Sequence, residues 1–191
     1  MTARLDLLAH GPSEATRAAR FPDDEALEAS AAQALQALRG KFRPYAQAFT
    51  APARAARETG VALGLNVDVE PALRDCDYGR WRGLPSKDVA EREPDAFAAW
   101  LGDPVAAPHG GESLATLIER VGAWLTQSLA RDGKTLAVTH ASVVRAAIVN
   151  ALGAGPSAFA RIDIAPLSLA RFSGRDGRWN LVALGPLRGL L

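Results

Sequence analysis

Residues 5–11, LDLLAHG, and residues 135–140, TLAVTH, carry the pattern that predicts the fold. Each is a short apolar run that ends in a histidine, as expected of a buried strand followed by a loop. The chain has only one other histidine. Parallel strands of an open α/β sheet deliver the side chains at their carboxyl ends to one edge of the sheet. We therefore expect His10 and His140 to face a common site.

Strand-like runs alternate with helical patterns along the chain. We expect strands at about residues 4–9, 45–50, 67–70, 134–139, 166–173 and 178–184, and helices at about 26–39, 52–64, 85–102, 113–130 and 141–153. This alternation predicts a three-layer α/β fold, in which helices cover both faces of a doubly wound, mainly parallel sheet. Asp176-Gly177 favours a tight turn, which predicts a C-terminal antiparallel hairpin.

Residues 71–112 interrupt the alternation with five prolines and two tryptophans. We expect a helical lid insertion over the strand ends, because such lids commonly shape substrate pockets. Trp81 and Trp100 are expected in the core of this lid, and His109 on its solvated surface. The length predicts a single domain over residues 1–191.

Composition excludes several classes of function. The net charge of +1 gives no concentrated positive field for nucleic acid or a membrane surface. The single cysteine, Cys76, and three scattered histidines disfavour a disulfide or a metal cluster, so we expect no metal and no cofactor. No segment is long and apolar enough for a secretion signal or a membrane span, which predicts a cytoplasmic protein. The sequence does not indicate the oligomeric state.

Two histidines at one sheet edge suit phosphoryl transfer. A neutral imidazole can attack phosphorus and form a phosphohistidine, which divides one difficult step into two. Gly11 after His10 permits close backbone approach. A second imidazole can donate a hydrogen bond to the phosphoryl oxygens, and a carboxylic acid must protonate the leaving oxygen.

The sequence resembles the histidine phosphatase superfamily, which has the phosphoglycerate mutase-like fold, over nearly its whole length. The matching segments are His10-Gly11 (Arg-His-Gly in the family), Arg20-Phe21 (Arg-Phe), residues 51–59 (Ser-Pro-Leu-x-Arg-Ala-x-x-Thr), 73–83 (Leu-x-Glu-x-x-Phe-Gly-x-Trp-Glu-Gly), 100–104 (Trp…Asp-Pro), 110–113 (Gly-Gly-Glu-Ser) and 138–145 (Val-Ser-His-Gly-Gly-Val-Ile-Arg). The short lid and the Gly-Gly-Glu-Ser segment resemble the small phosphatases, including α-ribazole phosphatase-like members, more than the true mutases.

The resemblance implies catalytic roles for three residues. His10 takes the place of the phosphate acceptor, and His140 that of the second imidazole. Asp75 stands where the family has its general-acid glutamate, one methylene shorter. Asp77 is the alternative acid, because residues two apart on an extended segment share a face.

Further residues correspond to the substrate pocket of the family. Ser13 and Arg20 are implied in the phosphate pocket, and Glu112 and Ser113 at its rim. Arg145 either binds phosphate or has a structural role. Ser113 can in addition cap the helix that follows it.

The phosphate pocket also departs from the family pattern. Ala9 and Ala55 stand where the family has two arginines, and Thr16 replaces the phosphate-contacting asparagine. Losing one preorganised donor typically costs about 10²–10³ in rate. Arg54 and Arg57, on the same helix as Ala55, are candidates to reach the pocket instead.

These observations support three hypotheses. The first is a metal-independent phosphatase that hydrolyses a small phosphorylated metabolite through phospho-His10, with activity weakened by the missing arginines. The second is a binding or regulatory module that has kept the fold and lost catalysis. The third keeps enzymatic activity for a less charged group, such as a phosphodiester, or for a substrate that brings its own cation.

Overall fold

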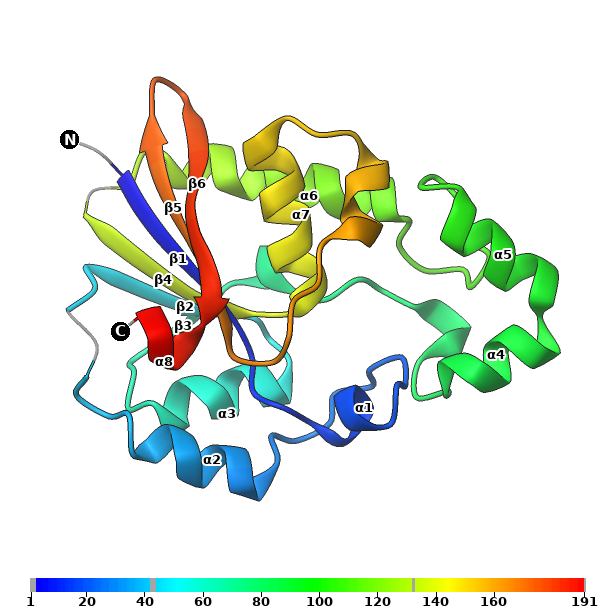
Figure 1. The fold of residues 1–191 in the computed structure, drawn as a ribbon, viewed down its shortest axis with the longest axis horizontal. Coiled ribbons are helices and arrows are strands. Elements are labelled where there is room, and N and C mark those ends of the chain that lie inside the picture. Colours follow the sequence, from blue (N-terminus) through cyan, green and yellow to red (C-terminus); the bar gives the residue numbers. More distant parts are fainter. Residues whose placement is uncertain (1–2, 42–43, 132, 191) are drawn as a thin grey trace.

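The computed structural model describes residues 3–41, 44–131 and 133–190. Six strands form one sheet in the order β3-β2-β4-β1-β5-β6 (Figure 1). They are β1 (Ala3–Ala9), β2 (Gln47–Thr50), β3 (Asp68–Val69), β4 (Lys134–Thr139), β5 (Ser168–Arg175) and β6 (Arg178–Pro186). The first four are parallel, and β5 and β6 are antiparallel to their neighbours. The predicted mainly parallel α/β fold is confirmed.

Helices pack on the sheet and also extend away from it. They are α1 (Glu14–Arg17), α2 (Ala29–Gln36), α3 (Arg54–Ala62), α4 (Ser86–Arg92), α5 (Pro94–Gly102), α6 (Leu114–Ser128), α7 (Ala141–Leu152), α8 (Leu187–Leu190) and the 3₁₀ turns η1 (Pro71–Leu73), η2 (Gly79–Trp81) and η3 (Pro156–Arg161). The short α1 and α8 were not expected from the sequence. Both have only four residues, too few for a periodic pattern.

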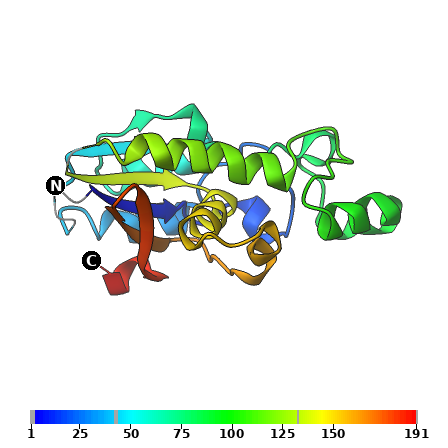
Figure 2. The same ribbon diagram turned by 90° about the horizontal axis from the view of Figure 1, so that it is seen from above.

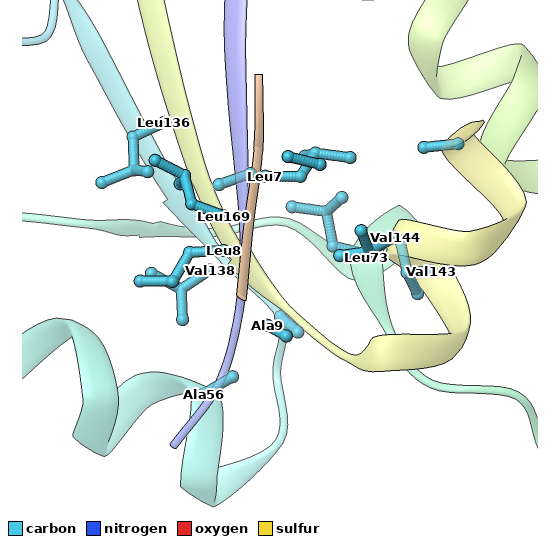
Figure 3. Close-up of a cluster of buried hydrophobic side chains, with 14 of the residues drawn as sticks. Leu7, Leu8, Ala9, Ala56, Leu73, Leu136, Val138, Val143, Val144 and Leu169 are labelled. Carbon is cyan, nitrogen blue, oxygen red and sulfur yellow. The ribbon is translucent and has the colours of Figure 1, made fainter. Parts of the chain in front are cut away.

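The register of β1 against β4 fixes the two strand ends side by side. Ala9 pairs with Thr139, and the His10 N–H donates to the Thr139 carbonyl at 2.8 Å. Both strands are almost wholly buried, as expected of central strands in a layered α/β fold. Figure 3 shows their apolar side chains packed between α3 and α7. The chain therefore leaves both strands at the same edge of the sheet.

Proline divides the expected helix at 85–102 into α4 and α5. Pro94 has no N–H to donate and starts α5, while Glu93 before it leaves the helical conformation, with φ −132° and ψ 56°. The expectation of one continuous helix was therefore wrong. In Figures 1 and 2, α4 and α5 project beyond the rest of the molecule, past the end of the sheet that carries the histidines.

A small aromatic core holds this lid. Phe21, Trp81 and Val89 are buried together, and Trp100 packs against them. The interpretation of His109 as solvated surface was wrong, because only 2% of His109 is exposed. Its ring lies 5.0 Å from that of Trp81, and its Nδ1 accepts the Gly111 N–H at 3.0 Å.

The C-terminal hairpin has the turn that its sequence predicts. Asp176 and Gly177 connect β5 to β6 and have φ values of +51° and +75°. Positive φ at both central residues is the type I′ geometry, whose twist matches that of the strands.

Two backbone segments cross closely where the lid joins the sheet edge. A Cβ on Gly111 would lie 2.0 Å from the Asp77 carbonyl oxygen, and one on Gly79 would lie 2.2 Å from that of His109. The Glu112 N–H donates to the Asp77 carbonyl at 2.7 Å across this crossing. Glycine is therefore required at both positions, and the crossing fixes the segment that carries Asp75.

We predict that Gly111→Ala lowers the free energy of unfolding by at least about 2 kcal/mol, because the backbone must separate at the crossing. The matched control is Gly102→Ala at the end of α5, where a Cβ meets no atom within 4 Å. Urea denaturation should show the control at or slightly above wild type. Equal stability of the two variants would contradict the crossing.

Candidate active site

His10 and His140 lie in contact at the carboxyl ends of β1 and β4. Their ring centroids are 5.1 Å apart, and the rings meet edge to face at 79°. The prediction that both histidines reach the same place is thus met by their geometry.

Hydrogen bonding sets the proton position on His10. Its Nδ1 lies 2.7 Å from the Gly11 carbonyl oxygen, which can only accept, so Nδ1 carries the hydrogen. In the neutral ring, Nε2 then has the free electron pair. The Gly11 N–H donates to Thr59 Oγ1 at 3.0 Å, and a Cβ on Gly11 would lie 2.5 Å from Leu27 Cδ1. A larger residue at position 11 would therefore require the Leu27 side chain to move.

His140 is buried without a hydrogen-bonded partner. Its side chain is 5% exposed, and neither ring nitrogen is hydrogen-bonded to any residue that the structure describes. Nδ1 lies 3.3 Å from Asp75 Oδ2, close but not aligned as a hydrogen bond. Burial lowers the pKa of His140 to about 4, and the Asp75 carboxylate only partly opposes this effect. A buried polar ring with unused nitrogens is expected at a ligand site.

Asp75 is held by groups on both sides of its carboxyl. Oδ1 accepts the Cys76 N–H at 2.8 Å and the Ser142 hydroxyl, and Oδ2 faces His140. The Asp77 carboxylate instead accepts the Gly79 N–H at 3.0 Å, within its own turn. Asp75 is therefore the carboxylate in contact with the histidine pair.

Two cavities adjoin the histidine pair, one beside each ring. The acid-side cavity, of about 420 Å³, is lined by His140, Asp75, Asp24, Arg74, Arg82 and Ala53, among others. The lid-side cavity, of about 510 Å³, is lined by residues that include His10, Arg20, Phe21, Tyr78, Trp100 and Arg145. Pro22 lines both cavities. A group bound between the rings has space on two sides.

Of the pocket residues that the resemblance implies near His10, two line a cavity and one caps a helix. Thr16 and Arg20 line the lid-side cavity. Ser13 is the N-cap of α1 and forms a capping box with Thr16, so its hydroxyl accepts the Thr16 N–H. Ser13 is therefore bonded to a neighbouring backbone group, as capping serines are.

Neither Arg54 nor Arg57 lines the two cavities. Arg54 bonds Glu58 at 2.7 Å, one turn along α3, and Arg57 is exposed. The slot between them is filled by Ala55, which is buried. The structure thus does not bring either candidate cation to the histidines.

Glu112 and Ser113 line a third cavity, which neither histidine lines but which shares Arg74 and Asp77 with the acid-side cavity. Ser113 is the N-cap of α6, as its sequence position predicts. Glu112 binds Arg120 with both carboxylate oxygens, at 2.8 and 2.7 Å, and Arg74 at 3.2 Å. Their place at the rim of the histidine pocket stays a prediction.

Arg120 of α6 is a residue that sequence reasoning missed. Its guanidinium donates to the carbonyls of Ala72, Arg74 and Asp75, at 2.7, 3.1 and 3.3 Å. Together with the two bonds to Glu112, these contacts fix the backbone that carries Asp75. In the sequence, Arg120 lies two turns into the helix that follows Glu112. This position does not distinguish it from an ordinary surface arginine.

Two further observations concern metals and membranes. Within residues 3–41, 44–131 and 133–190, no three His, Cys, Asp or Glu side chains are grouped so as to hold a metal ion. In the same part of the chain, no helix combines the length and the apolar character needed to cross a bilayer.

The fold and the histidine pair define a class of protein. The family model of the histidine phosphatase superfamily (branch 1) matches residues 5–186. The chain belongs to this superfamily, as the sequence motifs indicated.

Named relatives include phosphatases. A bifunctional protein of Mycobacterium tuberculosis is 32% identical over 185 residues, which cover 88% of this chain and 50% of the relative. A glucosyl-3-phosphoglycerate phosphatase of the same species is 35% identical over 119 residues, covering 58% of this chain and 53% of the relative. The chain thus spans about half the length of these curated relatives. An Escherichia coli structure described as a putative alpha-ribazole-5′-P phosphatase has a TM-score of 0.85 at 21% identity, covers 97% of each chain and shows the same fold.

The pKa of His140 leads to a prediction on stability. The pKa is about 4 in the folded chain, against an ordinary value of 6.5 once the ring is exposed by unfolding, so the unfolded chain binds the proton first. The free energy of unfolding should fall by about 3 kcal/mol from this group as pH drops from about 6.5 to about 4. Urea denaturation across this range should show a shallower fall for His140→Gln than for wild type. Parallel curves for the two proteins would contradict the buried, neutral state of His140.

Proposed function

We propose that this protein hydrolyses a phosphomonoester of a small phosphorylated metabolite, without a metal, through a phosphohistidine on His10. One observation carries the proposal: the Gly11 carbonyl fixes the His10 hydrogen on Nδ1, which leaves Nε2 as the nucleophile on a ring 5.1 Å, centroid to centroid, from a buried second imidazole. The phosphatase names of relatives support this reaction class.

The reaction has two steps. His10 Nε2 attacks phosphorus, the ester P–O bond breaks, and protonated Asp75 gives its proton to the leaving oxygen. A water then attacks the phosphohistidine, the N–P bond breaks, and Asp75 takes the proton from the water. His140 contributes a donor to the phosphoryl oxygens after it is protonated on ligand binding, because a nearby dianion favours its charged form.

Backbone N–H groups and acid-side charges compensate in part for Ala9 and Ala55. His140 is the N-cap of α7, which has no side-chain cap, so the first N–H groups of this helix are free to face a bound anion. Arg74 and Arg82 line the acid-side cavity with His140. Fewer fixed cations at the phosphoryl group predict slower turnover than with the full arginine set.

The alternative is a binding or regulatory module in which catalysis is lost. One contact favours it: Asp24, which lines the acid-side cavity, accepts the Arg54 N–H at 2.6 Å and so places a carboxylate at the N-terminus of α3. A carboxylate there weakens the attraction for a phosphoryl dianion. This module should form no phosphohistidine and bind vanadate weakly.

Partners and compartment remain predictions from the sequence. We propose a small phosphorylated metabolite as the partner and no nucleic acid or membrane. Cytoplasmic localisation is likewise proposed.

The phosphohistidine is directly testable. Wild-type protein quenched in alkali during turnover of 4-nitrophenyl phosphate should carry an alkali-stable, acid-labile phosphoryl group on His10. His10→Ala should lack it and should lose at least about 10³-fold in kcat. Activity in EDTA should be unchanged. Equal rates for wild type and His10→Ala would reject the proposed reaction, and the absence of any adduct with weak vanadate binding would favour the module.

A second experiment tests Asp75 as the acid. Asp75 is one methylene shorter than the glutamate of the family, and Ser142, in place of a glycine, donates a hydrogen bond to it. Ser142→Gly should lower kcat about 10–100-fold, because the carboxyl loses its position. Asp75→Glu alone should also be slow, since Ser142 occupies the space that the longer side chain needs.

The double variant Asp75→Glu with Ser142→Gly should recover activity. We expect a coupling energy of at least about 1 kcal/mol from the kcat/KM values of the four proteins. Additive losses would show that the two residues act separately, and an unaffected Asp75→Ala would exclude Asp75 as the acid.

A further inference from the structure

The histidine pair adjoins two cavities, whereas a phosphomonoester has one organic group to place. The leaving alcohol belongs in the acid-side cavity, because Asp75 lines that cavity and must reach the leaving oxygen. His10 lines the other, lid-side cavity. In-line attack by His10 therefore expels the leaving group away from the lid-side cavity, which at about 510 Å³ is the larger of the two.

The lid-side cavity has the lining of a site for an organic group. Phe21, Tyr78 and Trp100 supply aromatic surface, and Arg20 and Arg145 supply positive charge. Among the described residues that line it, none is a carboxylate. Such a lining fits an apolar or planar group with oxygen atoms at its edge.

Arg145 lines this cavity and has only a weak ion pair. Its Nε is buried and has no hydrogen-bond partner among the residues described. Its contact with Asp163 is long, at 3.7 Å, and the Asp163 side chain is fully exposed, so this ion pair is weak. The guanidinium is also 5.6 Å from the Phe159 ring, which holds it in place. A guanidinium without a strong ion pair at a cavity wall can bind the oxygen atoms of a ligand.

The charge around the phosphoryl position also favours a substrate with two organic groups. A phosphomonoester carries about −1.5 to −2 at neutral pH, whereas a diester carries a single negative charge. Ala9 and Ala55 remove two cations at this position, and Ala9 itself lines the lid-side cavity. A monoanion loses less from that change than a dianion does.

We propose that the same site also hydrolyses phosphodiesters, with the leaving alcohol in the acid-side cavity and the retained alcohol in the lid-side cavity. The proposal rests on the proposed function, with His10 as the nucleophile. His10 Nε2 bonds to phosphorus, one P–O ester bond breaks, and Asp75 protonates the departing alcohol. Water then breaks the N–P bond and gives its proton to Asp75, so a diester and water yield a monoester and an alcohol.

The first experiment traps the intermediate on wild-type protein. Turnover of bis(4-nitrophenyl) phosphate, quenched in alkali and examined by mass spectrometry, should show a His10 adduct that retains one nitrophenyl group. A bare phosphoryl adduct should accompany it, because the monoester product is itself a substrate. No diester turnover while 4-nitrophenyl phosphate is hydrolysed would overturn the proposal and leave the monoesterase intact. If wild type hydrolyses neither substrate, the proposed function itself fails.

A cavity-filling variant supplies the second test. Ser86 lines the lid-side cavity at the start of α4. Ser86→Trp should lower the ratio of diester to monoester kcat/KM at least about tenfold. Val182→Trp, on the exposed face of β6, is the matched control and should keep this ratio within about twofold of wild type. An unchanged ratio in a folded Ser86→Trp protein contradicts the assignment of the retained alcohol to this cavity.

Discussion

The parallel pairing of β1 with β4 is the constraint on which the site depends. Because Ala9 lies opposite Thr139, the next residue on each strand is a histidine, and the two rings come into contact. A shift of one residue in this register would turn every side chain of the strand to the opposite face of the sheet. The buried apolar side chains of both strands stabilise the register, so the core and the site share one cause (Figure 3).

The chemistry of the site comes from burial and backbone contacts more than from fixed cations. The Gly11 carbonyl sets the tautomer of His10, and burial keeps His140 neutral. Asp75 is oriented from α7 by Ser142, and its backbone is fixed from α6 by Arg120. A site built in this way holds the proposed nucleophile and the proposed acid in position with few fixed cations beside them. The proposed catalytic groups can therefore be in place although Ala9 and Ala55 supply no charge.

The sequence patterns predicted the strands, helices and turns, whose residues repeat with a regular period. They did not predict contacts between residues that are distant in the chain. The strand runs placed His10 and His140, and Asp176-Gly177 specified the hairpin turn. The helical pattern at 85–102 concealed a break, because Pro94 fits the first turn of a helix as well as it ends one. His109 looked solvated because its ring contacts are Tyr78 and Trp81, which only the folded lid brings to it. Arg120 and Ser142 carry no local signal, since their roles lie in bonds to Asp75, which is distant in the chain.

A crystal structure with bound vanadate tests the account most directly. We predict vanadium bonded to His10 Nε2, a vanadate oxygen within hydrogen-bond distance of His140, and the apical oxygen opposite His10 facing Asp75 from the acid-side cavity. Vanadate bound elsewhere on the protein, or a His10 ring turned away from it, would contradict the claim that these two imidazoles bind one phosphoryl group.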